Sequence, residues 1–338
     1  MSKVNTSSAV DSVVFSCGAV MKNRFMLAPL TNCQSHEDGR LSDEEFDWLT
    51  MRAKGNFGLV MTCAAHVQLR GQGFPGQLGV YSDALLDGHR RLAAAIQSHG
   101  SLAVVQLHHA GMRSPADLIG EVPVCPSEDS KTGARALSLT EVYQLRDDFI
   151  EAAVRCQRAG YDGVEIHGAH GYILCQFLSV KYNRREDDYG GSLENRARII
   201  HEIVKGIRAR CGPQFLLGVR LSPERFGMDV GECMTVCQGL VDLGLVDFLD
   251  LSLWDCFKQP EDEQFCHKSL LQHVTILDKK NVLLTVAGKI LTAENVRDVL
   301  AAGVDFVTIG RGGILHHDFP DKVLNDSTFE PVSLPVSR

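Results

Sequence analysis

The chain has 338 residues, of which 44% are hydrophobic and 22% charged, and these values exclude a disordered or fibrous protein. A formal net charge of −8, without a cluster of Lys and Arg, argues against nucleic-acid and membrane-surface partners and favours a small molecule. The chain also has eleven cysteines without CxxC spacing and no apolar leader or run of about 20 apolar residues, which predicts a cytoplasmic protein with reduced thiols.

Short apolar runs between turn signals predict β-strands throughout the chain. In chain order they cover residues 25–28, 58–62, 102–107, 163–167, 216–221, 247–252, 282–286 and 305–309. Segments with helical periodicity lie between them, at 42–55, 83–100, 140–160, 193–211, 231–244, 263–279 and 292–303. Several of these begin at a capping residue followed by an acid and end at a glycine, as helices commonly do.

Eight apolar strands that alternate with helices predict an α/β fold, a single (β/α)8 TIM barrel formed by one domain over residues 1–338. A doubly wound open sheet is the alternative, but it predicts a GxGxxG turn after an early strand, and the sequence has none. Residues 108–137 form a long polar segment after the third strand, and segments of this length are often functional.

The active site of such a barrel lies at the carboxyl ends of the strands, so the residues found there are the candidates. They are Pro29 and Thr31 after strand 1, Ala64 at strand 2, Gln106 and His109 at strand 3, His167, His170 and Tyr172 at strand 4, Arg220 at strand 5, Gly288 at strand 7, and Gly310 and Arg311 at strand 8.

The glycine loops after strands 7 and 8 let backbone N–H groups approach a ligand closely, and Arg311 adds a guanidinium suited to phosphate. The same glycines would also serve simple tight turns. Arg220 and Gln106 could together bind the imide-like edge of a heterocycle, with the arginine offsetting negative charge that appears on reduction.

His167 and His170 are three residues apart and could be ordinary satisfied polar residues, metal ligands with Glu165 as the third, or neutral donors to a substrate oxygen. Tyr172 could then give a proton to a carbanion-like carbon. We favour the neutral donors and expect no metal.

At these positions the sequence resembles the Old Yellow Enzyme family, the FMN-dependent NAD(P)H oxidoreductases or ene-reductases. The resemblance rests on "KNRFMLAPLTN", "VVQLHHAG", "GYDGVEIHGAHGYILCQFLS", "NRREDDYGGSLENRARI", "GVRLSPERFG" and the late "VAGK…VDFVTIGRG". These blocks run in order from Asn23 to Gly312, and the one that begins with "HGAHGY" is the most specific.

The resemblance implies a role for each candidate. The residues that match FMN-binding positions of the family are Pro29, Thr31, Ala64, Gln106, Arg220, Gly288, Gly310 and Arg311. His167 and His170 match the pair that binds the activating oxygen of the substrate, and Tyr172 matches the proton donor. The implied reaction is ping-pong: NADH or NADPH reduces FMN, which then passes hydride from its N5 to an activated alkene such as an enone, maleimide or nitroalkene.

The sequence departs from the usual family pattern at Met112, at Cys175 and in "SLWDCFKQPEDEQ" after strand 6, which leaves the substrate open. The absence of cysteines after Cys266 predicts FMN as the sole prosthetic group, without an iron–sulfur cluster. Family members occur as monomers, dimers and tetramers, so a homo-oligomer remains open. Two rival functions are a non-catalytic FMN-binding protein and a flavin-free barrel lyase, for which Lys289 is the only lysine near a strand end.

Overall fold

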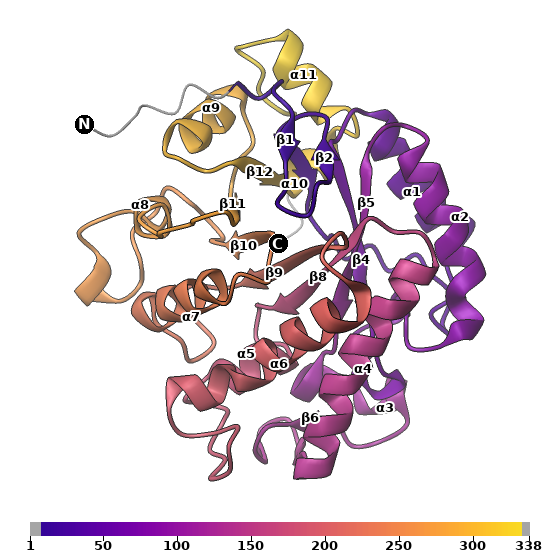
Figure 1. The fold of residues 1–338 in the computed structure, drawn as a ribbon, viewed down its shortest axis with the longest axis vertical. Coiled ribbons are helices and arrows are strands. Elements are labelled where there is room, and N and C mark those ends of the chain that lie inside the picture. Colours follow the sequence, from indigo (N-terminus) through magenta and orange to yellow (C-terminus); the bar gives the residue numbers. More distant parts are fainter. Residues whose placement is uncertain (1–7, 333–338) are drawn as a thin grey trace.

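The structure is a computed structural model that describes residues 8–332, and its centre is a closed barrel of eight parallel strands (Figure 1). In barrel order the strands are β3 (Phe25–Leu27), β4 (Leu59–His66), β5 (Leu102–His108), β8 (Gly163–Gly168), β9 (Leu216–Leu221), β10 (Phe248–Ser252), β11 (Leu283–Ala287) and β12 (Phe306–Ile309). Nearly all of their residues are buried, because helices cover the outside and side chains fill the inside. The predicted (β/α)8 barrel is confirmed, with each strand at its predicted place.

Helices connect the strands around the outside of the barrel (Figure 1). They are α1 (Asp43–Lys54), α2 (Leu86–Gln97), α4 (Leu139–Arg158), α6 (Leu193–Cys211), α7 (Val230–Leu243), α8 (Leu270–Val274) and α9 (Ala293–Ala301), followed by α10 (Arg311–Leu315) and α11 (Phe319–Asn325) after the last strand. Ser42 and Thr292 cap α1 and α9 with their side-chain oxygens, as the sequence predicted, whereas the cap of α4 is Ser138, two residues before the predicted start at residue 140. Across residues 8–332 no helix has the length and apolar character needed to cross a membrane.

One predicted helix is wrong in extent. Instead of a continuous helix over 263–279, the structure has a 3₁₀ turn, Glu263–Phe265, and the five-residue helix α8. The break has a local cause, because Ser269 adopts extended backbone angles and exchanges hydrogen bonds with Gln272 in a capping box. A serine that caps a helix cannot also continue the preceding one.

A hairpin closes the amino-terminal end of the barrel. Strands β1 (Val13–Val14) and β2 (Val20–Met21) pair antiparallel, and Phe15 between them packs against the first residues of β10 and β12. The Phe15 ring centroid lies 5.9 Å from that of Phe248 and 5.7 Å from that of Phe306. These rings fill the floor of the barrel, so the opposite end, where the strands terminate, is the open one.

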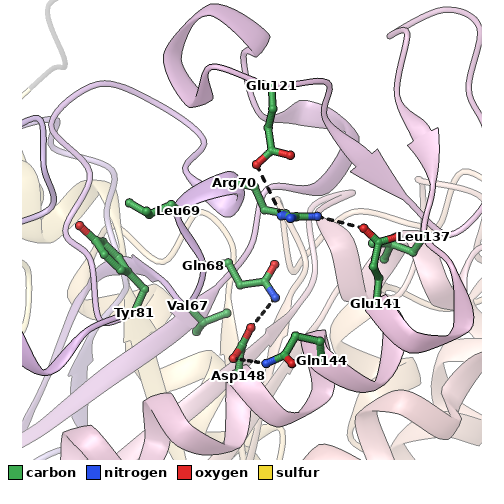
Figure 2. A pocket seen from close by; sticks show the side chains of 10 residues that line it. All are labelled: Val67, Gln68, Leu69, Arg70, Tyr81, Glu121, Leu137, Glu141, Gln144 and Asp148. Atoms are coloured by element: carbon green, nitrogen blue, oxygen red, sulfur yellow. Dashed lines mark hydrogen bonds and ion pairs between the residues drawn. The ribbon is translucent and has the colours of Figure 1, made fainter.

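The long segment after β5 leaves the barrel and returns to it at α4. It contains a short helix, α3 (Ala116–Ile119), and the paired strands β6 (Val124–Cys125) and β7 (Arg135–Ala136). Beside α4 it borders a polar surface cavity of about 400 Å³ (Figure 2). There Arg70 lies between Glu121 and Glu141, at 3.6 and 3.2 Å. None of the predicted site residues lines this cavity.

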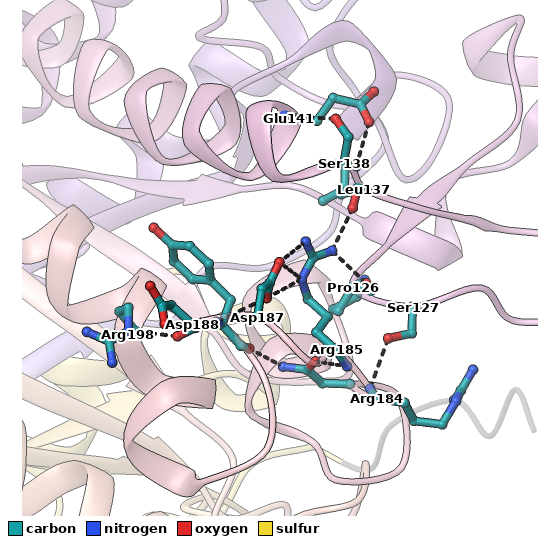
Figure 3. Close-up of polar contacts among 12 residues, drawn as sticks. Pro126, Ser127, Leu137, Ser138, Glu141, Arg184, Arg185, Asp187, Asp188 and Arg198 are labelled. Carbon is teal, nitrogen blue, oxygen red and sulfur yellow. Dashed lines mark hydrogen bonds and ion pairs between the residues drawn. The ribbon is translucent and has the colours of Figure 1, made fainter.

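The motif "NRREDDYGG" anchors this segment to the barrel (Figure 3). Arg185 donates from Nη1 to the carbonyl of Pro126 at 2.9 Å and to that of Leu137 at 2.6 Å. Asp187 pairs with the same guanidinium at 2.5 Å, and the arginine side chain is 9% exposed. One buried cation therefore holds the segment at two points, just after β6 and just after β7.

Replacing Arg185 with Met should loosen the segment without disturbing the barrel strands. The change removes two charge-assisted hydrogen bonds and leaves Asp187 without its cation, so we expect a loss of about 2–4 kcal/mol in the free energy of unfolding. Limited proteolysis should then cut within residues 108–137. Lys205→Met, at an exposed position of α6, is the control and should cost less than about 1 kcal/mol; equal losses in the two variants would contradict the anchoring role.

Candidate active site

His167, His170 and Tyr172 come together at the carboxyl end of β8. His167 is near the end of the strand, and Tyr172 caps the short helix α5 (Ile173–Leu178). His170 lies in the turn between them with a φ of +60°, and its amide donates to Ser222 Oγ at 3.1 Å. The Tyr172 ring centroid is 5.1 Å from that of His167 and 6.5 Å from that of His170. A strained backbone at a non-glycine residue is typical of functional sites.

The two imidazoles contact each other. His170 Nδ1 lies 3.1 Å from His167 Nε2, and His170 Nε2 lies 2.7 Å from Ser252 Oγ. Arg113, from the segment after β5, donates to the His170 carbonyl at 2.6 Å, and its Cζ lies 4.7 Å from the centre of the Tyr172 ring. The long segment therefore contributes a cation directly to the cluster.

Both histidines are neutral at physiological pH. Burial is the main cause that lowers the pKa of His167 far below its ordinary value, helped by the neighbouring histidines and Arg220. Burial, then Arg220 and Arg113, lower the pKa of His170 to about 3. Neutral imidazoles can donate one hydrogen bond each without adding a charge to the site.

A third histidine belongs to this cluster, and the sequence analysis missed it. His108 is fully buried, and its ring centroid lies 4.3 Å from that of Tyr172. His109, which the strand-end reasoning singled out instead, points away and contacts Gln68 Oε1 at 3.1 Å. The missed signal was the alternation along β5: residues two apart face the same side, so His108 shares the inward face with Gln106.

Buried neutral histidines should make the protein acid-sensitive. Burial depresses the pKa of six of them, His66, His89, His108, His109, His167 and His170, so each binds its proton only on unfolding. Their contribution to stability is complete above the unfolded pKa of about 6.5 and is lost as the pH falls towards the folded values.

Urea unfolding at pH 7, 6 and 5 tests this prediction. We expect His109→Gln to reduce the rise of unfolding free energy with pH by about 1.4 kcal/mol per pH unit, the value for one proton. His99→Gln, at an exposed position, should leave this slope unchanged. A wild-type slope in His109→Gln would show that His109 is not kept neutral by the fold.

A cavity of about 340 Å³ lies at the mouth of the barrel beside the histidines. Five of the eight residues predicted to hold FMN line it, namely Pro29, Arg220, Gly288, Gly310 and Arg311. The other three do not: Thr31 is exposed beyond β3, while Ala64 and Gln106 are register partners on β4 and β5 and are buried. The structure thus brings five of the eight residues predicted to bind FMN together around one cavity.

Gly288 shows that this cavity is shaped by backbone. Its φ is +156°, and a Cβ there would lie 2.9 Å from the Cys256 amide nitrogen and 3.1 Å from that of Asp255. Only glycine fits this approach. Arg311 is exposed at the cavity and has no acidic partner within residues 8–332, whereas Lys289 is bound to Asp255 at 2.7 Å. Arg311 is therefore free to bind an anionic group such as a phosphate.

Gln106 and Arg220 each contact a buried carboxyl group inside the barrel. Gln106 Nε2 donates to Glu165 Oε1 at 2.7 Å, and Arg220 Nε lies 3.0 Å from Asp250 Oδ2. Glu165 points into the barrel rather than towards the two histidines as a metal ligand would. Within residues 8–332 no three His, Cys, Asp or Glu side chains are arranged to hold a metal ion.

A second cavity, of about 300 Å³, adjoins the first. It shares His170, Ser252 and Trp254 with the first cavity, and Tyr172 and Arg113 also line it. Trp254 belongs to the segment after β10 that the sequence left unassigned; its φ is +61° and its side chain is largely exposed. This segment therefore forms the rim between the two cavities.

Ion pairs hold this rim to the loop after β9. Lys258 contacts Glu224 at 2.5 Å, and Arg225 contacts Glu261 at 2.9 Å. The site as a whole can hold a polar ring system with an anionic tail in the first cavity. It can hold a small molecule in the second, between neutral donors and a phenol.

The amino-acid sequence matches the family described as NADH:flavin oxidoreductase / NADH oxidase over residues 17–328. The chain is 36% identical over 320 residues to the "Probable NADH-dependent flavin oxidoreductase YqiG" of Bacillus subtilis, covering 91% of this chain and 86% of that protein. It is 36% identical over 245 residues to an NADPH dehydrogenase of Bacillus pumilus, covering 70% of each. It is 31% identical over 316 residues to the NADH oxidase of Thermoanaerobacter brockii, covering 90% of this chain and 48% of that protein, so it spans about half the length of this relative.

A solved structure has the same architecture. The Old Yellow Enzyme homologue from Zymomonas mobilis superposes with a TM-score of 0.85 at 28% sequence identity, covering 97% of this chain and 95% of that one.

Proposed function

The chain belongs to the NADH:flavin oxidoreductase / NADH oxidase family, and from this membership we propose that it reduces the activated carbon–carbon double bond of a small molecule with electrons from NADH or NADPH. The observation that carries the proposal is the meeting of the two cavities at His170, with Tyr172 lining the second. A molecule in the second cavity would lie between the phenol of Tyr172 and a molecule bound in the first cavity.

FMN is the cofactor of this oxidoreductase family, and the first cavity fits it. Gly288, Gly310 and Arg311 would hold its phosphate end, and Arg220 with Gln106 its pyrimidine edge, where the guanidinium opposes negative charge. Pro29, Thr31 and Ala64 complete the proposed set. Bound FMN supplies the chemistry of accepting a hydride from the nicotinamide and delivering it to the alkene.

His167 and His170 orient the alkene by donating to the oxygen of its activating group. In the structure the two imidazoles are hydrogen-bonded to each other, with 3.1 Å between His170 Nδ1 and His167 Nε2. A substrate oxygen would replace this contact. Because both imidazoles are neutral and fixed by their surroundings, they can stabilise charge that develops on that oxygen. Tyr172 then donates its phenolic proton to the α-carbon.

We propose that the reduced nicotinamide and the alkene occupy the second cavity in turn, which gives ping-pong kinetics. Both must reach the same reactive face, and this cavity of about 300 Å³ is the one that joins His170 to Tyr172. A flavin-free lyase is not favoured, because Lys289 is paired with Asp255 and is not a free amine.

Purified protein tests the proposal in two steps. We expect it to bind FMN with a flavin absorption spectrum, which NADH or NADPH bleaches without oxygen. Addition of an enone, maleimide, nitroalkene or nitrate ester should restore the spectrum, and the products should identify the reduced bond. Protein that takes up no FMN would contradict the whole proposal, whereas reducible flavin that none of these substrates reoxidises would leave only a flavin-binding role.

A further inference from the structure

Two carboxyl groups lie behind Arg220 in the barrel interior. Glu165 is on β8 and Asp250 on β10, the strands on either side of β9, which carries Arg220. Both carboxyl side chains have no exposed surface. Glu165 accepts a hydrogen bond from Gln106, and Asp250 is the ion-pair partner of Arg220. Each carboxyl group thus contacts one of the two residues proposed for the pyrimidine edge of FMN.

These carboxyl groups have too few donors to be ionised together. Glu165 Oε2 and both oxygens of Asp250 lack a hydrogen-bond partner among residues 8–332, and Arg220 Nε makes a charge contact that is not an aligned hydrogen bond. A buried carboxylate is stable only when cations or donors compensate it. One guanidinium compensates one carboxylate, so the other carboxyl group keeps its proton.

The effects of burial and neighbouring charges on the two pKa values agree with one retained proton. Burial, followed by the charge of Asp250, raises the pKa of Glu165 to about 8, against the opposing effects of Arg220 and Gln106. Burial also raises the pKa of Asp250, against Arg220 and the nearby Thr308 hydroxyl. Because the charge of Asp250 acts on Glu165, the proton belongs to the pair. A pKa of about 8 at Glu165 places loss of this proton in mildly alkaline solution.

We propose that Glu165 and Asp250 are positioning residues that share one proton, and that this proton sets the charge which Arg220 presents to FMN and hence the reduction potential of the flavin. The inference rests on the proposed function, since it requires FMN next to Arg220. With the proton in place, one carboxylate opposes the guanidinium; without it, two do. Reduction adds negative charge to the flavin, so loss of the proton disfavours reduction.

The experiment compares the FMN-loaded wild type with Glu165→Gln, which resembles the protonated glutamic acid. The reduction potential is measured by anaerobic spectroscopic titration against dyes of known potential between pH 6 and 10. The two curves should coincide near pH 6–7. Above about pH 8 the equilibrium constant for reduction in the wild type should fall roughly tenfold below that of the variant, which is about 30 mV for a two-electron couple. Parallel curves over the whole range would overturn the inference.

Asp250→Asn provides an independent test of the coupling. It removes the charge that raises the pKa of Glu165, so the bend in the potential curve should move to lower pH, and an unmoved bend would contradict a shared proton. Glu45→Gln is the matched control: Glu45 is also a fully buried carboxyl group with a raised pKa, but it lies on α1 outside the barrel. Its curve should follow the wild type.

The outcomes separate this inference from the proposed function. Wild-type protein that binds no FMN would refute the proposed function. Wild-type protein that binds FMN but shows no bend between pH 7 and 9 would overturn the shared proton alone, without the need for any variant to fold.

Discussion

Replacing Tyr172 with Phe is expected to slow reduction of the alkene by about two to four orders of magnitude, the usual contribution of a general acid. Reduction of bound FMN by the nicotinamide should be unchanged, because that step needs no proton from the phenol. The change removes one hydroxyl group and keeps the ring that packs against His108 and His167. Stopped-flow measurement of the two half-reactions checks both expectations.

Tyr143→Phe is the control for this experiment. Tyr143 lies on α4, and its side chain is exposed on the outside of the barrel, so both half-reactions should keep their wild-type rates. A quinone, which accepts a hydride without needing a proton on carbon, should remain a good oxidant of the Tyr172→Phe enzyme. If this variant reduced enones at the wild-type rate, Tyr172 would not be the proton donor.

Replacing Arg220 with Met should reduce both stability and FMN binding. The change leaves Asp250 buried without its cation, and breaking a buried ion pair in this way costs about 3–5 kcal/mol. Loss of the proposed charge-assisted hydrogen bond to the flavin should weaken FMN binding by roughly tenfold to a hundredfold. Urea unfolding of the FMN-free protein and fluorescence titration with FMN measure the two effects separately.

The stability loss in Arg220→Met should depend on pH. Burial raises the pKa of Asp250 above its unfolded value, so its neutral form is favoured in the fold and the associated stability is lost as the pH rises. Without Arg220 this pKa rises further, and the difference from the wild type should be smallest in acid and grow with pH. A difference independent of pH would contradict the role of Asp250.

Arg208→Met is the matched control for Arg220→Met. Arg208 pairs with the buried Asp247 at 2.9 Å, on the side of the barrel that the hairpin closes. This variant should also lose stability, but FMN affinity should remain that of the wild type because neither residue reaches the mouth. Equal losses of FMN affinity in both variants would show that the effect of Arg220 is only structural.

The barrel was predictable because its strands are buried on both faces and therefore appear as apolar runs without alternation. Helix starts were predictable where a capping side chain acts locally, as at Ser42. The capping box of Ser269 and Gln272 follows the same local rule, and it divides the segment 263–279. The helices α10 and α11 were not predicted; they are only five and seven residues long, and so carry little periodicity.

The candidate site was only partly predictable. Residues at or directly after the end of a strand, such as His167 and Gly288, could be placed because the carboxyl ends of parallel strands meet at one edge. The contact between Gln106 and Glu165 could not, since it depends on which side chains of neighbouring strands fill the same layer of the barrel. Trp254 could not be placed either, because its position follows from a strained loop held by ion pairs with another loop.

The hairpin that carries Phe15 covers the amino-terminal end of the barrel, and side chains fill its interior. The barrel therefore has one face open to small molecules, at the carboxyl ends of its strands. Under the proposed function, the oxidised nicotinamide would leave from the same cavity that the alkene then enters. Each reactant would then exclude the other, and we expect an excess of either one to inhibit turnover competitively. The rate of a full cycle would then depend on the release of products from this cavity as well as on the hydride and proton transfers.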